Sequence, residues 1–198
     1  MFNQLRKPLQ PLINLIAAPF MWVHPNVLSL FSFVIAAPGF YFYAKGDSLL
    51  GSLFILGAMF DSIDGAVAKK TGKTTKFGGV LDATLDRVFD GLVLFFIGVG
   101  GLVDWAWLFL AFIAFVTVSY IKAKTEAVSS ELNVGTNRFP VGIAQRGERI
   151  AIIFLASILN YFITPDKNEM LAGAIIILLI MALITVVWRG LLTKKEIG

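Results

Sequence analysis

The sequence predicts an all-α integral membrane protein, with six transmembrane helices preceded by a short N-terminal interfacial helix. The chain of 198 residues is 57% hydrophobic and only 15% charged, whereas soluble domains average about 25% charged residues. Its mean hydropathy is +0.79. Six apolar runs approach the roughly 20 residues that a helix needs to cross a bilayer; they cover residues 27–44, 47–68, 78–102, 103–121, 141–163 and 170–188. We expect residues 1–198 to form a single domain.

The order of elements follows from the apolar pattern and its breaks. The N-terminal segment favours an interfacial helix, because its aliphatic side chains lie roughly on one helix face; they are Leu5, Leu9, Leu12, Ile13 and Ile16. Turn residues or polar stretches separate the six spans at residues 45–47, 71–73, 126–140 and 164–166 and near Asp104. The fifth span is the weakest, because its strictly apolar part is short and charged residues stand at its entrance.

Basic residues are distributed unevenly between the two sides of the predicted membrane domain. Six spans place both termini, the second–third connection and the fourth–fifth connection on one side. Of the 17 Lys and Arg residues, all but Lys45 and Lys167 lie in those regions or at their helix ends. This asymmetry predicts a multi-pass protein of the cell membrane with that side in the cytoplasm. Contact with anionic lipid also accounts for part of this charge, so no nucleic-acid partner is expected.

Five aspartates within residues 61–90 are the least expected feature of so apolar a chain. Asp61 and Asp64 lie three residues apart and share a helix face, and Asp82, Asp86 and Asp90 form a second row at intervals of four. Carboxylates within a membrane span are costly and indicate a functional site.

Four converging carboxylates need a positive partner, because like charges so close cannot otherwise all stay ionised. Oxygen ligands favour Mg²⁺, Mn²⁺ or Ca²⁺, and a chain with no cysteine and one histidine gives no basis for a zinc or thiolate site. A structural network with Lys69, Lys70 and Arg87 is the alternative.

The acidic stretch resembles the signature of the CDP-alcohol phosphotransferases, integral membrane enzymes of phospholipid synthesis. The matching residues read Asp61-x2-Asp64-Gly65-x2-Ala68-Lys69-x8-Gly78-x3-Asp82-x3-Asp86. The family usually has Arg where this chain has Lys69, and Lys offers a point charge where Arg offers a planar fork. Either Lys69 still meets a diphosphate oxygen, or Lys70 or Lys73 shares the task.

The small and hydroxyl-bearing residues of this region fit a nucleotide-diphosphate site. Gly65 and Gly78 permit close approach of a ligand to the backbone, although Ala68 fits plain helix packing as well. The turn of residues 71–75 offers hydroxyls, amides and positive charge at a helix entry. Upstream, Pro25-Asn26-x2-Ser29 resembles the family element that lines the CDP pocket. The resemblance thus implies a CDP-lipid site made of Asn26, Ser29, Gly65, Ala68, Lys69, Thr75 and Gly78.

The resemblance also implies the reaction. An acceptor alcohol attacks the lipid-side phosphorus of a CDP-linked lipid, CDP-diacylglycerol or CDP-archaeol, and CMP is released. Two Mg²⁺ or Mn²⁺ ions would be held by Asp61, Asp64, Asp82 and Asp86. Asp86 is also the expected general base. No role is assigned to Asp90 beyond supporting the ligands from behind or a structural part. A homodimer is implied in the same way.

Two further stretches, residues 119–127 and 142–149, resemble the branch that uses inositol 1-phosphate: the bacterial phosphatidylinositol-phosphate synthases and archaeal archaetidylinositol-phosphate synthases. Lys124, Gln145 and Gly147 depart from that pattern. A phosphorylated polyol needs a cluster of cations, and we expect it to be Lys122, Arg146, Arg149 and Arg189. These cations are alternatively topology signals and lipid contacts.

Three alternatives remain open on the sequence. Glycerol 3-phosphate is a second phosphorylated acceptor for the same chemistry. A small cation transporter also places acids within spans, but it does not need the Gly65, Ala68 and Gly78 spacing. A lipid-binding or scaffolding membrane protein does not need the four aspartates.

Overall fold

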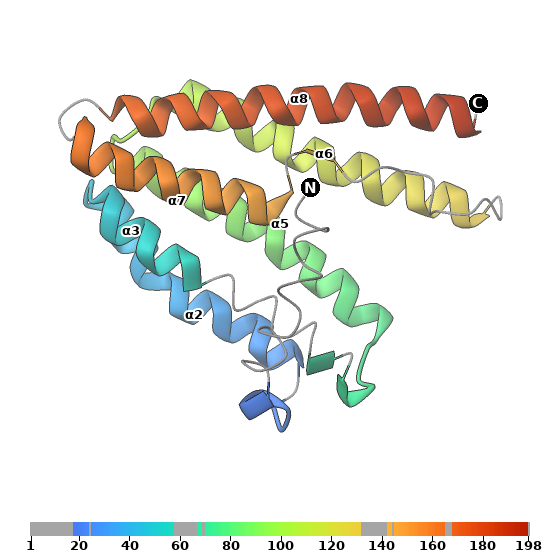
Figure 1. Ribbon diagram of the computed structural model, residues 1–198. Helices are drawn as coiled ribbons and strands as arrows, with labels where there is room; N and C mark the ends of the chain where they lie inside the picture. Colours follow the sequence, from blue (N-terminus) through green and yellow to red (C-terminus); the bar gives the residue numbers. More distant parts are fainter. Residues whose placement is uncertain are drawn as a thin grey trace.

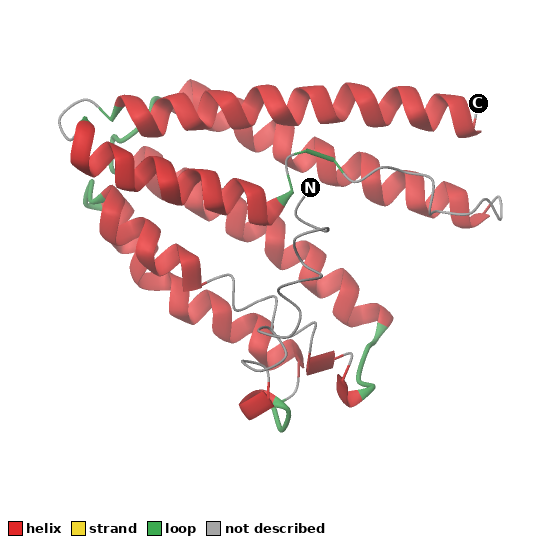
Figure 2. Cartoon of the chain, in the orientation of Figure 1, coloured by secondary structure: helices red, strands yellow, loops and turns green. Residues whose placement is uncertain are grey.

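The computed structural model of the chain describes residues 18–23, 25–57, 67–68, 70–131, 142–143, 145–164 and 168–197. Every regular element within these residues is a helix (Figure 2). A 3-10 turn, η1 (Ala18–Phe20), precedes six α-helices, which are α2 (Pro25–Ala44), α3 (Ser48–Ile55), α5 (Lys76–Val99), α6 (Trp105–Glu131), α7 (Arg146–Ile163) and α8 (Glu169–Ile197).

The predicted all-α fold with six helices is therefore confirmed, while some boundaries differ. The predicted interfacial helix falls within residues 1–17, outside the described residues, as do residues 58–66 of the second predicted span. Two helices run beyond the predicted spans: α6 continues to Glu131 and α8 to Ile197. Polar side chains continue a helix as readily as apolar ones where the chain leaves a membrane, and Lys122 and Glu126 support this part of α6 as an i,i+4 ion pair (3.8 Å).

Length and apolar composition single out two of the described helices as candidate membrane spans, Trp105–Glu131 and Glu169–Lys195, with a shorter apolar helix at Leu30–Ala44. Helices α5 and α7 carry more charge, because α5 contains the acidic row and α7 begins with Arg146, Glu148 and Arg149. These charged helices are the ones that the rest of the bundle must shield from lipid.

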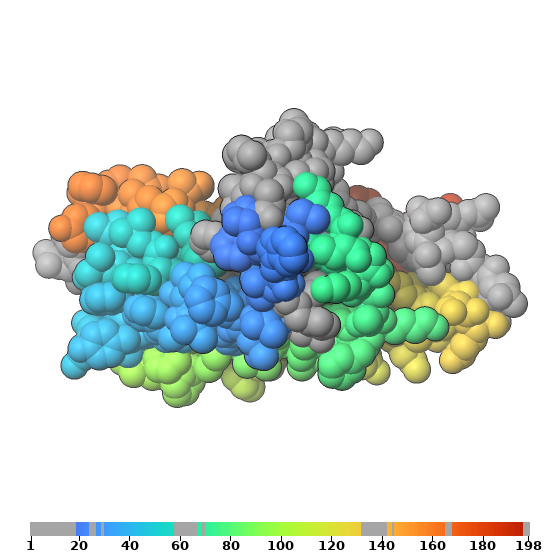
Figure 3. All heavy atoms as spheres, turned by 90° about the horizontal axis from the view of Figure 1, so that it is seen from below, coloured from blue at the N-terminus to red at the C-terminus, as the bar shows by residue number. Residues whose placement is uncertain are grey.

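The six helices close into a ring of packed neighbours (Figure 1). Going around it, α2 packs on α3, α3 on α7, α7 on α8, α8 on α6, α6 on α5 and α5 on α2. Figure 3 shows one face of this arrangement, where α2 lies between α3 and the start of α5. Helices α5 and α7 are not among the closely packed pairs.

The ends of the helices gather as the predicted topology requires. In Figure 1 the ends of α6 and α8 and the start of α5 lie toward the right of the view, whereas the α2–α3 and α5–α6 turns lie at its left. Lys45 belongs to the α2–α3 turn. The basic side of the predicted topology and the side with few cations thus lie at opposite ends of the bundle.

Apolar side chains fill the interior and also cover much of the exterior. Phe89, Ile97 and Leu108 are fully buried, and Phe89 packs edge-on against Phe33. On the outside, large apolar side chains such as Phe109 stay exposed. An apolar exterior over long helices is the surface that a bilayer requires.

Glycines allow two close approaches between helices. A Cβ on Gly39 of α2 would lie 2.8 Å from the carbonyl oxygen of Gly51 on α3. A Cβ on Gly100, just after α5, would lie 1.9 Å from the carbonyl oxygen of Tyr43 on α2. Because both obstacles are backbone atoms, which no rotamer change can move, the contacts depend on the absence of a side chain.

The end of the bundle with few cations is held by neutral hydrogen bonds. The Tyr43 hydroxyl lies 3.3 Å from Ser157 Oγ, and Ser48 Oγ donates to the Ser157 carbonyl (3.5 Å). One turn further along α7, Asn160 Nδ2 donates to Asn168 Oδ1 (2.7 Å). These buried polar groups join α2, α3, α7 and the start of α8.

We expect Gly39→Ala to destabilise the bundle by about 1–3 kcal/mol, since the added methyl overpacks the α2–α3 contact. Thermal denaturation in detergent measures this as a lower midpoint. Gly173→Ala on α8 is the control, because its Cβ would meet nothing within 4 Å and alanine favours a helix by about 1 kcal/mol. Equal midpoints for the two variants would contradict the close α2–α3 packing.

Candidate active site

The acidic row predicted from the sequence lies on one face of α5. Asp82, Asp86 and Asp90 follow one another at intervals of four residues in this helix. Asp82 and Asp86 are half-buried, whereas Asp90 is buried. The row therefore runs from the partly open start of α5 into the interior of the bundle.

The turn before α5 has a defined capping structure. Thr75 is the N-cap, and its Oγ1 accepts a hydrogen bond from the backbone N–H of Gly78 (2.9 Å). Just upstream, the N–H of Lys73 donates to the Ala68 carbonyl (3.0 Å), and Gly72 has a φ of 67°. Thr75 and Gly78, both predicted to bind the CDP-lipid, thus meet each other at the start of the acidic helix.

Helix α7 supplies the positive partners of the acidic row. The Arg146 guanidinium forms an ion pair with the Asp86 carboxylate, and the Arg149 guanidinium with Asp90. At the start of α7 the backbone N–H of Gln145 donates to Glu148 Oε2 (3.1 Å), a capping contact that fixes this first turn.

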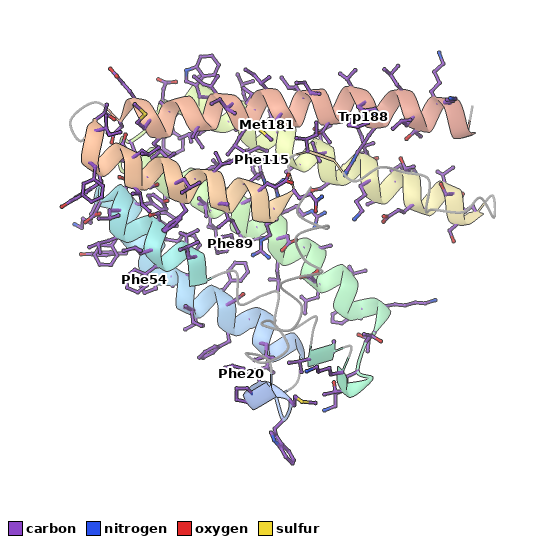
Figure 4. All side chains as sticks on the ribbon, in the orientation of Figure 1. Phe20, Phe54, Phe89, Phe115, Met181 and Trp188 are labelled. Atoms are coloured by element: carbon purple, nitrogen blue, oxygen red, sulfur yellow. The ribbon has the colours of Figure 1, made fainter. Side chains whose placement is uncertain are left out.

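Both guanidinium groups also lie over aromatic rings. Arg146 is 5.1 Å from the ring centroid of Phe89 on α5, and Arg149 is 4.7 Å from that of Phe115 on α6. Figure 4 labels both phenylalanines within the bundle. Cation–π contacts in a dry environment add to each ion pair, so α5, α6 and α7 meet at these arginines.

The other two predicted acceptor cations lie at α6. Arg189 of α8 donates from Nη1 to the carbonyl of Val118 (2.8 Å). Lys122, one turn further along α6, is exposed and pairs with Glu126. Gly142 packs against Arg189, because a Cβ there would lie 3.0 Å from its Nη2. The structure thus brings Arg146 and Arg149 to the acids, and Arg189 to the helix that carries Lys122.

Several predicted site residues fall outside what the structure describes. Asp61, Asp64, Gly65 and Lys69 are among the residues without a described placement. Asn26 and Ser29 belong to the first turns of α2, but their side chains are likewise not described. For these six residues the sequence predictions stand as predictions.

The described part of the acidic row fits a hard divalent cation. Within the described residues no three His, Cys, Asp or Glu side chains form a metal-binding group, and two of the four predicted ligands lie outside those residues. Asp82 and Asp86 offer oxygen donors one turn apart, as Mg²⁺ and Mn²⁺ prefer. The guanidinium at Asp86 shows that this face accommodates a positive charge beside the carboxylate.

The ion pairs between the acidic row of α5 and the arginines of α7 were not predicted from the sequence. From the sequence, Arg146 and Arg149 were assigned to an acceptor phosphate and Asp90 was given no partner. The described ion pairs of Asp86 and Asp90 are with Arg146 and Arg149, and Arg87 donates to the carbonyl of Ala83 in its own helix; Lys69, which belongs to the alternative network, lies outside the described residues. The usable signal was the spacing: one turn separates Asp86 from Asp90, and about one turn separates the two arginines.

We expect Thr75→Ala to destabilise the start of α5 by about 1 kcal/mol, because the Gly78 N–H loses its cap. Thr75→Ser keeps the hydroxyl and is the matched control. Thermal denaturation midpoints in detergent compare the two, and a wild-type midpoint for the alanine variant would contradict the capping role.

Comparison with known proteins identifies the family of the chain. The model of the CDP-alcohol phosphatidyltransferase family matches residues 22–188. The archaetidylinositol phosphate synthase of Pyrococcus horikoshii is 40% identical over 158 residues, covering 79% of this chain and 80% of that protein. The protein of the same name from Methanothermobacter thermautotrophicus is 34% identical over 194 residues, covering 96% and 92%.

Solved structures show the same fold. The Mycobacterium tuberculosis phosphatidylinositol phosphate synthase with CDP-DAG bound superposes with a TM-score of 0.77 at 25% identity, covering 94% of this chain and 95% of that one. The same enzyme in complex with manganese and citrate gives a TM-score of 0.78 at 25% identity, covering 94% and 90%. The family match, the full-length relatives and the shared membrane fold lead to one conclusion: this chain is a membrane enzyme of the CDP-alcohol phosphatidyltransferase family.

Proposed function

We propose that this enzyme transfers the lipid phosphatidyl or archaetidyl group of a CDP-linked lipid to the hydroxyl of inositol 1-phosphate, with release of CMP. The observation that carries the proposal is the meeting of acids and arginines between α5 and α7. It occurs in a chain that matches most of the length of relatives named for inositol phosphate products.

The CDP-lipid site is proposed at the start of α5 and the adjoining segments. Its residues are Asn26, Ser29, Gly65, Ala68, Lys69, Thr75 and Gly78. The capped turn at Thr75 supports this location, since the start of a helix presents backbone N–H groups to a phosphate. The structure of the mycobacterial enzyme with CDP-DAG bound supports the lipid class.

The proposed metal site takes two Mg²⁺ or Mn²⁺ ions on Asp61, Asp64, Asp82 and Asp86. When bound, such ions neutralise the diphosphate and stabilise the attacking and leaving oxygens. A manganese complex of the mycobacterial enzyme supports a divalent ion, and the half-buried Asp82–Asp86 face supports its place.

Asp86 is proposed to accept the proton of the acceptor hydroxyl. That oxygen forms the new bond to the lipid-side phosphorus, the bond from phosphorus to the CMP oxygen breaks, and the electron pair leaves with CMP. The Arg146 guanidinium pairs with Asp86 and so balances its negative charge beside the acceptor site.

The acceptor phosphate is proposed to bind Lys122, Arg146, Arg149 and Arg189. Guanidinium groups hold a phosphate through paired charge-assisted hydrogen bonds. Arg146 lies beside the proposed base, so a phosphate held there brings its polyol to Asp86.

Orientation and assembly belong to the same proposal. The basic end of the bundle faces the cytoplasm, as the distribution of Lys and Arg favours, and the enzyme works as a homodimer. Relatives named archaetidylinositol phosphate synthase favour an isoprenoid-ether lipid, and those named phosphatidylinositol phosphate synthase favour a diacyl lipid.

We expect the purified enzyme to use myo-inositol 1-phosphate and not free myo-inositol, measured as CMP release with each CDP-lipid. Arg189→Ala should weaken acceptor use about ten- to a hundred-fold with little change in the KM for the CDP-lipid, because one charge-assisted contact contributes about 1.5–3 kcal/mol. Lys194→Ala, an exposed cation on the same helix, is the control. Equal rates with inositol 1-phosphate and free inositol would refute the acceptor; a preference for glycerol 3-phosphate would replace it.

We expect Asp82→Asn to lose both turnover and Mn²⁺ binding by more than about 100-fold, since even groups behind the ligands contribute 10- to 100-fold. Electron paramagnetic resonance of bound Mn²⁺ measures the second quantity without substrate. Asp104→Asn is the control, because this carboxylate caps α6 by accepting the Ala106 N–H (2.8 Å) and Asn keeps that acceptor. Wild-type Mn²⁺ affinity in Asp82→Asn would rule out the metal site.

A further inference from the structure

Asp90 lies one turn beyond the proposed metal carboxylates, and the proposed reaction gives it no part. Its side chain is 10% exposed, and that of its partner Arg149 is 6% exposed. An isolated charge in such an interior is strongly destabilising, so each of these ions depends on the other.

The two ion pairs between α5 and α7 are in register. One turn of α5 separates Asp86 from Asp90, and about one turn of α7 separates Arg146 from Arg149. The two helices are not closely packed against each other, so these long side chains span the space between them. A slip of α7 by one residue would rotate its side chains by about 100° and break both pairs.

The outer and inner pairs differ in accessibility. Asp86 and Arg146 are 24% and 14% exposed, whereas Asp90 and Arg149 are 10% and 6% exposed. In the proposed reaction both members of the outer pair take other partners. Asp86 binds a metal ion and accepts a proton, and Arg146 binds the acceptor phosphate. The inner pair has Phe115 at 4.7 Å as an additional neighbour from α6. It is the more deeply buried of the two pairs.

Metal ligation does not account for Asp90. It lies eight residues from Asp82, a rise of about 12 Å along α5, and its charge is already balanced by a buried guanidinium.

We propose that Asp90 is a positioning residue of the acceptor site: it holds Arg149 and, through it, the first turn of α7 at the depth where Arg146 meets Asp86. This inference rests on the proposed function for the part that concerns the acceptor. Its geometric part, the register of α7 against α5, is independent of the substrate.

The kinetic test compares Asp90→Asn with the double variant Asp90→Asn/Arg149→Gln. In Asp90→Asn the KM for inositol 1-phosphate should rise about ten-fold or more, with Mn²⁺ affinity and the KM for the CDP-lipid unchanged. The double variant removes the unpaired buried cation, so its thermal midpoint should recover, while its acceptor KM stays high because Arg149 is itself a proposed phosphate contact. A merely structural role of Asp90 would lower the midpoint of Asp90→Asn and leave its acceptor KM unchanged.

Ser157→Ala is the matched control, because Ser157 is a buried polar residue at the other end of the same helix. It should lower the thermal midpoint and leave the acceptor KM unchanged. An unchanged acceptor KM in folded Asp90→Asn overturns the proposal, and so does a loss of Mn²⁺ affinity, which would make Asp90 a metal ligand.

The geometric part is tested with spin labels at Val88→Cys on α5 and Leu155→Cys on α7, both exposed positions in a chain with no cysteine. We expect Asp90→Asn and the double variant to shift or broaden the distance between the labels, and Ser157→Ala to leave it unchanged. A wild-type enzyme inactive with inositol 1-phosphate would refute the proposed function and the acceptor part with it. An unchanged label distance in Asp90→Asn would refute the register of α7.

Discussion

Opposite charges buried between α5 and α7 are the interaction on which the rest of this structure depends. Carboxylates inside an apolar bundle are tolerated only with positive partners, and Arg146 and Arg149 supply these to Asp86 and Asp90. The remaining helices complete the ring to which the two charged helices belong. Apolar α6 and α8 therefore serve the chemistry indirectly, by keeping lipid away from charges that lipid would not accommodate.

The same pairing makes the site versatile. In the proposed reaction, the Arg146 guanidinium balances the charge of Asp86 and also carries the positive charge that a phosphorylated acceptor needs. These tasks require that the ion pair can open so that another ion or group replaces one partner. A half-buried pair permits this. The Asp90–Arg149 pair is more deeply buried, which suits the positioning role proposed for Asp90. Two adjacent ion pairs of the same chemical type thus differ in role because they differ in burial.

Much of this could be predicted from the sequence, since apolar run length predicts spans and the distribution of Lys and Arg predicts topology. The row of Asp82, Asp86 and Asp90 followed from the helical period alone. The partners of Asp86 and Asp90 did not, because residue spacing within α5 and α7 says nothing about their relative register. The ends of α6 and α8 were also missed, since polar residues continue a helix beyond its apolar part. Thr75 was predicted as a ligand contact, and its capping of α5 became visible only once the start of that helix was placed.

The hydrogen bonds around Ser157 have a mechanical consequence for the opposite end of α7. Tyr43 and Ser48 fasten α7 to its neighbours near its last turns, far from the arginines of its first turn. A helix that is held near one end is displaced most at its other end when it tilts. A rise of about 16 Å separates Ser157 from Arg146 at the start of α7, so a tilt of roughly 5° about Ser157 displaces the first turn by about 1.4 Å. The Asp90–Arg149 pair lies at this first turn, where the displacement would be largest, so one ion pair there limits the tilt of the whole helix.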